Sequence, residues 1–81
     1  MSIEVTKRIT RRRDICRGDA CIENIRIPVW ELVSLHRQGV SDGEIMRLMP
    51  RLTIEDIAAA WSYAMDNLEE INKNIRENEE Y

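Results

Sequence analysis

Apolar residues follow two different patterns along this chain, and the first covers residues 1–27. There, short apolar pieces stand beside turn residues and lack helical spacing. Ile15-Cys16 and Cys21-Ile22 flank residues 17–20, and this arrangement predicts a tight turn between two short strands. Ile25-Arg26-Ile27 alternates like a further short strand. The first third of the chain is therefore predicted to be extended, with a short hairpin.

From residue 28 onward the apolar spacing is helical, and the expected helices have start and stop signals. Pro28 suits a first helical position, because its missing N–H costs nothing there, and Gly39 is a natural stop. Ser41 and Glu44 form a capping box that begins a second helix. Pro50 ends it, because the residue before a proline is pushed out of the helical region.

A third helix is expected to begin after Thr53, whose capping box Asp56 completes. No Gly or Pro follows, so the pattern predicts one helix from Ile54 into the low seventies. The spacing of the second and third helices matches a helix-turn-helix. We predict a mainly α fold with a short N-terminal β-hairpin and an extended C-terminal helix. The expected organisation is a basic arm over 1–27, a helical core over 28–66 and an acidic helix extension over 67–81.

The last predicted helix also carries a heptad seam. The seam residues are Ile54, Trp61, Leu68 and Ile75 on one row and Ile57, Ala64 and Ile71 on the next. A three-helix domain can bury this seam to about Met65, but no further element is left to cover the apolar residues after it. We therefore expect the late seam to dock on a second chain, either another copy or a different protein. The alternative is that it folds back over the N-terminal strands. The expected interface residues are Trp61, Met65, Leu68, Ile71 and Ile75.

Composition narrows the class of protein. A chain of 81 residues allows one small domain, and an aromatic content of 5% with no Phe favours helices over a β-sandwich. No apolar run approaches the roughly 20 residues that span a bilayer, and the N-terminus lacks a signal-peptide core. A cytoplasmic protein without membrane contact is therefore expected.

Charge is distributed unevenly. Residues 1–39 hold 8 Lys/Arg and 5 Asp/Glu, whereas residues 40–81 hold 4 Lys/Arg and 10 Asp/Glu. The basic end is suited to nucleic acid phosphates, and the acidic end is suited to a basic protein or simply to solubility. The expected DNA-binding residues are Lys7, Arg8, Arg11, Arg12, Arg13, Arg17 and Arg51.

Catalytic chemistry is not expected. His36 is the only histidine, and it is predicted to be a partly buried packing residue on the first helix. Glu55 and Asp56 fall in a helix first turn, where the helix dipole favours them. Cys16 and Cys21 lack the second pair that a zinc site needs, so we expect neither metal nor cofactor. They are predicted to be two buried thiols; a disulfide across the hairpin fits the spacing, but the cytosol keeps thiols reduced.

Several segments together carry a family resemblance. They are Ile15-Cys16-Arg17-Gly18-Asp19-Ala20-Cys21-Ile22, Arg26-Ile27-Pro28-Val29-Trp30, Gly39-Val40-Ser41 and Pro50-Arg51-Leu52-Thr53-Ile54-Glu55-Asp56-Ile57. Over residues 9–72 the chain resembles a small prokaryotic family known as domain of unknown function 433. Asn24-Ile25-Arg26 stands where the family usually has Gly before Thr-Arg, and Ala20 stands where it often has Pro. A role for that Gly-Thr pair in contacting a partner does not carry over.

The resemblance implies a homeodomain-like three-helix domain. Many members are regarded as antitoxins that pair with a neighbouring PIN-like ribonuclease toxin. By resemblance, this chain is expected to be an antitoxin-like module of a type II toxin–antitoxin pair that also binds double-stranded operator DNA. The alternatives are a stand-alone homodimeric DNA-binding transcription regulator and a small oligomeric scaffold without DNA contact.

Overall fold

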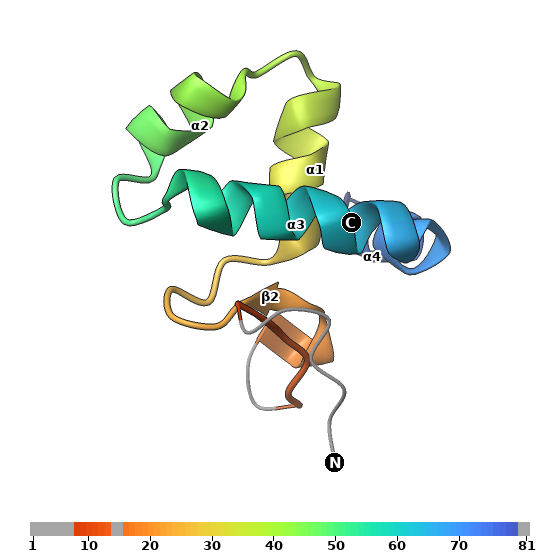
Figure 1. Ribbon diagram of the computed structural model, residues 1–81. Helices are drawn as coiled ribbons and strands as arrows, with labels where there is room; N and C mark the ends of the chain where they lie inside the picture. The colour runs from red at the N-terminus through yellow and green to blue at the C-terminus, as the bar shows by residue number, and fades with distance from the viewer. Residues whose placement is uncertain (1–7, 14–15, 80–81) are drawn as a thin grey trace.

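In the described part of the chain, four α-helices stand over a small two-stranded sheet (Figure 1). The computed structural model describes residues 8–13 and 16–79. The elements in chain order are β1 (Ile9–Thr10), the 3-10 helix η1 (Cys16–Gly18), β2 (Cys21–Ile22), α1 (Val29–Arg37), α2 (Asp42–Leu48), α3 (Ile54–Asp66) and α4 (Leu68–Glu79). The prediction of a mainly helical domain with an N-terminal hairpin is confirmed. None of the helices in the described segments is long and apolar enough to cross a membrane.

The strands of the hairpin differ from those predicted. β1 and β2 are antiparallel, with Ile9 opposite Ile22 and Thr10 opposite Cys21. Cys16, expected in a strand opposite Cys21, instead begins η1 with a left-handed φ of 53°. This register places Ile9 and Ile22 on the sheet face that covers the helices, and both residues belong to the core.

The expected strand at residues 25–27 is also corrected, since this segment forms no strand. Arg26 has a φ of 58°, which lies outside the extended region. Its N–H donates to the Ile22 carbonyl at 2.7 Å, and the Ile22 N–H donates to the Ile27 carbonyl at 2.8 Å. These hydrogen bonds fold the chain back immediately after β2 and deliver Pro28 to the start of α1.

Capping fixes the end of α1 and the start of α2. Gly39, with a φ of 93°, donates to the His36 carbonyl at 3.0 Å, and Val40 donates to the Leu35 carbonyl at 3.1 Å. This pair of bonds is a Schellman ending, which a residue without a Cβ adopts at low cost. The Ser41 hydroxyl accepts from the Glu44 N–H at 3.1 Å, as predicted.

The capping box of α3 is complete. The Thr53 hydroxyl accepts from the Asp56 N–H at 3.1 Å, and the Asp56 carboxylate accepts from the Thr53 N–H at 3.1 Å. Leu52 and Ile57 on either side of the cap are both buried, as a hydrophobic staple requires. The sequence signal therefore places this helix start correctly.

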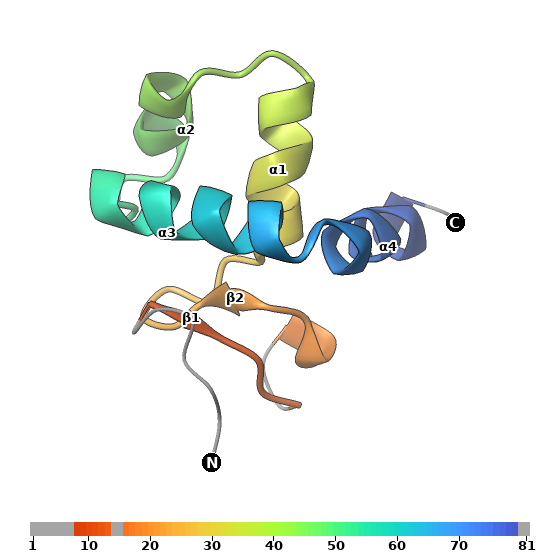
Figure 2. The same cartoon turned by 45° about the vertical axis from the view of Figure 1, so that its right-hand side comes forward.

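The prediction of a single long last helix is wrong at Asn67. There the backbone leaves the helical region, with φ −135° and ψ 45°, and the Asn67 side-chain amide donates to the Tyr63 carbonyl at 3.0 Å. An asparagine side chain competes in this way with the helical hydrogen-bond pattern. The chain turns, and Figure 2 shows α4 leaving the line of α3 and lying beside α1, which it contacts.

Because of this turn, the last apolar residues of the heptad seam are buried within their own chain. Ile71 is 0% exposed and Ile75 is 9% exposed, and both belong to the core of their own chain. The prediction that they dock on a second chain is corrected, because α1 supplies the cover that a straight helix would have lacked. The buried core is Ile9, Ala20, Ile22, Val29, Leu32, Val33, Ile45, Leu52, Ile57, Ala60, Tyr63, Ala64, Ile71 and Ile75.

Candidate functional site

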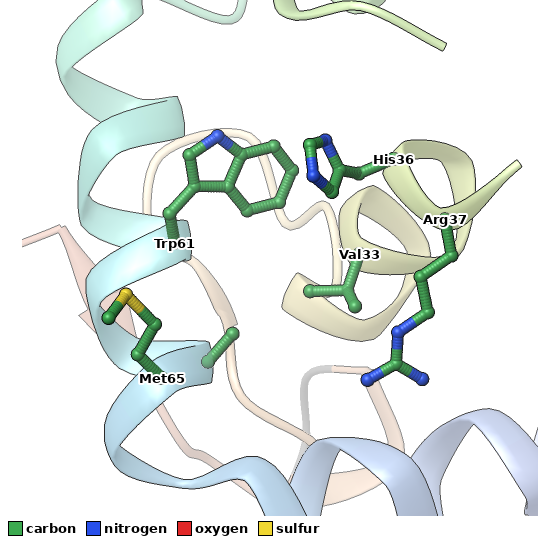
Figure 3. Close-up of a pocket in the computed structure, with 6 residues that line it drawn as sticks. Val33, His36, Arg37, Trp61 and Met65 are labelled. Carbon is green, nitrogen blue, oxygen red and sulfur yellow. The ribbon is translucent and has the colours of Figure 1, made fainter. Parts of the chain in front are cut away.

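An open groove of about 360 Å³ lies between α1 and α3 (Figure 3). We call it the α1/α3 groove. It is lined by Val33, His36, Arg37, Trp61, Ala64 and Met65. Val33 and Arg37 are one helical turn apart on α1, as are Trp61 and Met65 on α3, so each helix presents one edge of the groove. The walls are largely apolar, and the guanidinium of Arg37 stands on the α1 side.

Trp61 is held in place by contacts on two sides. Its indole N–H donates to the Asp42 carboxylate at 3.3 Å, and its ring lies 5.0 Å from the His36 ring at an angle of 49°. The hydrogen bond ties α3 to α2, and the ring contact ties it to α1. His36 packs on an aromatic ring as expected of a packing residue, but it is exposed rather than partly buried. The indole therefore forms a fixed wall of the groove.

The surface near the groove exposes apolar side chains. Met65 is 80% exposed and Leu68, just after the turn at Asn67, is 51% exposed. Asp66 and Glu69 are exposed beside them in the chain. The junction of α3 and α4 thus combines exposed apolar and acidic residues.

The predicted interface residues separate into two groups. Trp61, Met65 and Leu68 reach the surface, whereas Ile71 and Ile75 do not. Sequence reasoning missed the α1 side of the groove, formed by Val33 and Arg37. Their spacing of one helical turn is a weak signal, because the same spacing occurs on any amphipathic helix.

Three of the predicted DNA-binding arginines contact carboxylates of their own chain. Arg8 donates to Asp56 of α3 at 2.9 Å. The Arg11 side chain lies 3.8 Å from Glu70 of α4, and that of Arg12 lies 3.5 Å from Glu23 after β2. The segment that carries Arg8, Arg11 and Arg12, which we call the basic segment, is therefore held against the rest of the domain at three points. These arginine side chains remain partly exposed, at 43%, 62% and 52% respectively.

The other predicted DNA-binding residues lie elsewhere. Arg13 follows these three arginines and is exposed, and Arg51 is exposed in the turn before α3. Arg17 is part of η1, but its side chain lies outside the described part of the chain, as does the whole of Lys7. The structure thus brings Arg8, Arg11 and Arg12 to the domain and places Arg51 in a separate turn.

Two acidic contacts have shifted protonation equilibria. Burial raises the pKa of Asp56, but the hydrogen bonds from Thr53 and Arg8 outweigh it, and the net effect holds this pKa below its usual 3.8. The Tyr63 hydroxyl donates to the Glu70 carboxylate at 2.9 Å, and burial together with this bond raises the pKa of Tyr63 to about 12. Both groups keep fixed protonation states near neutral pH, which suits structural contacts.

The described segments contain no group of three or more His, Cys, Asp or Glu side chains that could hold a metal ion. Cys16 is partly exposed and Cys21 is buried, and both are free thiols. The α1/α3 groove is therefore the feature best suited to binding.

The family described as "Protein of unknown function (DUF433)" matches residues 9–64, which is more than half of the chain. The chain belongs to the DUF433 family. A crystal structure of a DUF433 member protein from Anabaena variabilis is similar to it over 89% of this chain and 71% of that chain, with 42% sequence identity and a TM-score of 0.83. No curated protein matches the chain. The DUF433 match runs from β1 into α3 and includes the whole lining of the groove except Met65.

Proposed function

We propose that this DUF433 protein is a non-enzymatic, antitoxin-like module that binds a PIN-like ribonuclease toxin through the α1/α3 groove and Leu68. The observation that carries the proposal is the exposure of Met65, at 80%, on the rim of an apolar groove. A long unbranched side chain of this kind adapts its shape to a partner surface. Exposed apolar groups beside a concave surface are typical of protein-binding sites.

The expected occupant is a basic protein. The exposed carboxylates of Asp66 and Glu69 flank the apolar residues Met65 and Leu68. Residues 40–81 as a whole carry 10 Asp/Glu and 4 Lys/Arg. A ribonuclease must attract RNA phosphates with Lys and Arg, so its cleft is complementary in charge to this surface. The apolar contact would supply affinity, and the carboxylates would supply specificity and orientation.

Replacing Met65 by glutamate is expected to weaken binding of the toxin at least about tenfold, which corresponds to about 1.4 kcal/mol. The added carboxylate would have to be desolvated against an apolar partner surface. The measurement is co-expression with the adjacent gene product, then co-purification and titration. Leu48→Glu is the matched control, since Leu48 is 59% exposed on α2, outside the groove lining. Equal binding by both variants and the unchanged chain would contradict the proposed surface.

We also propose that the basic segment contacts operator DNA. Arg11/Arg12/Arg13→Ala is expected to lower affinity for a duplex and to reduce the slope of log K against log salt concentration by up to about 2.7. Fluorescence anisotropy at several salt concentrations measures this. Lys73→Ala on α4, where Lys73 lies 3.9 Å from Glu77, is the control for removal of charge alone. An unchanged slope in the triple variant would remove these arginines from the DNA contact.

The stand-alone homodimeric regulator is the alternative proposal. It depends on a self-pairing heptad seam, and the burial of Ile71 and Ile75 removes them from that seam. Sedimentation at two concentrations separates the two proposals. A concentration-dependent dimer that does not bind the adjacent gene product supports the regulator. A small oligomeric scaffold would show the same dimer without affinity for DNA.

A further inference from the structure

The two cysteines of the chain meet at the hairpin. Cys16 is the first residue of η1, and its thiol donates to the Arg26 carbonyl at 3.2 Å. Cys21 is the first residue of β2, where it pairs with Thr10 on one side and forms a bridge with Pro28 on the other. Arg26 and Pro28 belong to the segment that folds back on β2, so the Cys16 side chain reaches the same segment that covers Cys21.

The two thiols also lie close enough to influence each other. A hydrogen bond and the charge of Cys16 are among the causes that raise the pKa of Cys21, after burial, so the two side chains lie within interaction range. The predicted hairpin also brings the two residues together, but across paired strands, which the structure does not form at Cys16. Their proximity arises instead because η1 turns the chain, with Asp19 donating to the Cys16 carbonyl at 2.9 Å and Gly18 taking a φ of 87°.

We propose that Cys16 and Cys21 are a redox site that a low-molecular-weight disulfide such as oxidised glutathione converts to a reversible intramolecular disulfide. Cys16 is the thiol that reacts first, because it is partly exposed, whereas Cys21 is 0% exposed. Cys21 is the resolving thiol, because it pairs with Pro28 in the segment whose Arg26 carbonyl the Cys16 thiol contacts. This site is independent of the proposed toxin binding.

The reaction balances in two exchange steps. The Cys16 thiolate attacks one sulfur of oxidised glutathione, so a mixed disulfide forms and one glutathione thiolate leaves. The Cys21 thiolate then attacks the Cys16 sulfur, the protein disulfide forms, and a second glutathione thiolate leaves. The protein gives up two electrons and two protons, and one oxidised glutathione becomes two reduced molecules. Excess reduced glutathione reverses both steps.

The second step is expected to be slow and base-dependent. Burial, then the hydrogen bond and charge of Cys16, raise the pKa of Cys21 to about 12. Only the thiolate attacks, so the closure rate should rise about tenfold for each unit of pH between about 7 and 9. Closure also replaces the hydrogen bond from Cys16 to the Arg26 carbonyl, and it ties η1 to β2 covalently.

The test treats the full chain with oxidised glutathione and follows its mass and its free thiols. The expected product has lost two hydrogens, carries no disulfide to a second chain and regains both thiols in reduced glutathione. Cys21→Ser is expected to stop at one glutathionyl adduct on Cys16, and Cys16→Ser is expected to stay unmodified. A wild-type chain that stops at the adduct, stays reduced or forms only intermolecular disulfides would overturn the site, and an adduct on Cys21 would overturn the order of attack.

A measurement on the unchanged chain shows whether the fold favours the disulfide or whether the short loop between the two cysteines is sufficient. The equilibrium constant for closure with glutathione is expected to be at least about tenfold larger in buffer than in about 6 M urea, since only the folded chain holds the sulfurs together. A ratio of one or less would show that the fold does not favour the disulfide. Circular dichroism of each variant, recorded alongside, identifies any loss of folding that would otherwise imitate a chemical effect.

Discussion

Ile71→Ala is expected to destabilise the folded chain by about 2–5 kcal/mol. Ile71 is 0% exposed on α4, and its side chain belongs to the core of its own chain. Truncation removes buried methyl groups and leaves a cavity that α1 and α3 cannot fully close. Urea denaturation followed by circular dichroism measures the change in the free energy of unfolding.

Leu68→Ala is the matched control, since Leu68 lies one turn earlier on α4 but is 51% exposed. Its free energy of unfolding should change by no more than about 0.5 kcal/mol. If both variants were equally mild, α4 would not be packed on α1 in solution. Ending the chain after Asn67 should go further and abolish cooperative unfolding, because Ile71 and Ile75 would be lost together and α1 would lose the helix packed beside it.

The second large effect is expected at Asp56. Asp56→Ala should cost about 1–3 kcal/mol, because the start of α3 loses an acceptor for the Thr53 N–H and Arg8 loses a carboxylate. The side chain of Arg8 is 43% exposed, so water screens the ion pair and most of the cost comes from the cap. Asp56→Asn keeps an acceptor oxygen for Thr53 without the charge, and it should cost less than the alanine variant. Equal stability of all three chains would contradict this role.

The pH dependence of the unfolding free energy also tests the role of Asp56, and its direction can be predicted. The folded pKa of Asp56 lies below the usual 3.8, so its ionisation stabilises the fold above that value. This stability is lost as the pH falls from 3.8 through the lowered folded pKa, because the unfolded chain binds the proton first. The difference in unfolding free energy between the wild-type chain and Asp56→Asn should therefore shrink over that interval. A difference that is constant with pH would exclude an ionised Asp56.

The parts of the fold that depend on local chemistry could be predicted, and those that depend on packing could not. Gly39, Ser41 and the Thr53–Asp56 box mark helix ends because each satisfies backbone groups within a few residues. The turn at Asn67 was missed because asparagine is tolerated inside many helices. It becomes a break here because the turn lets Ile71 and Ile75 be buried against α1.

The candidate site divides in the same way. Trp61, Met65 and Leu68 could be identified because apolar residues at helical spacing exceed what three helices can bury. Their division into one wall residue and two exposed residues depends on the Asp42 hydrogen bond and the His36 ring, which come from other helices. The basic residues were visible as a run of charge, but a run of charge does not reveal which carboxylates lie opposite. Glu70 and Asp56 are distant in sequence from Arg11 and Arg8, and only the fold brings them together.

The carboxylates beside Arg8, Arg11 and Arg12 compete with any anion that binds these arginines. Arg8, Arg11 and Arg12 each lie close to a carboxylate on a different part of the domain. A polyanion that binds them exchanges one negative partner for another, so it gains only the difference between the two. The acidic groups of the protein thus reduce the affinity of these arginines for a polyanion.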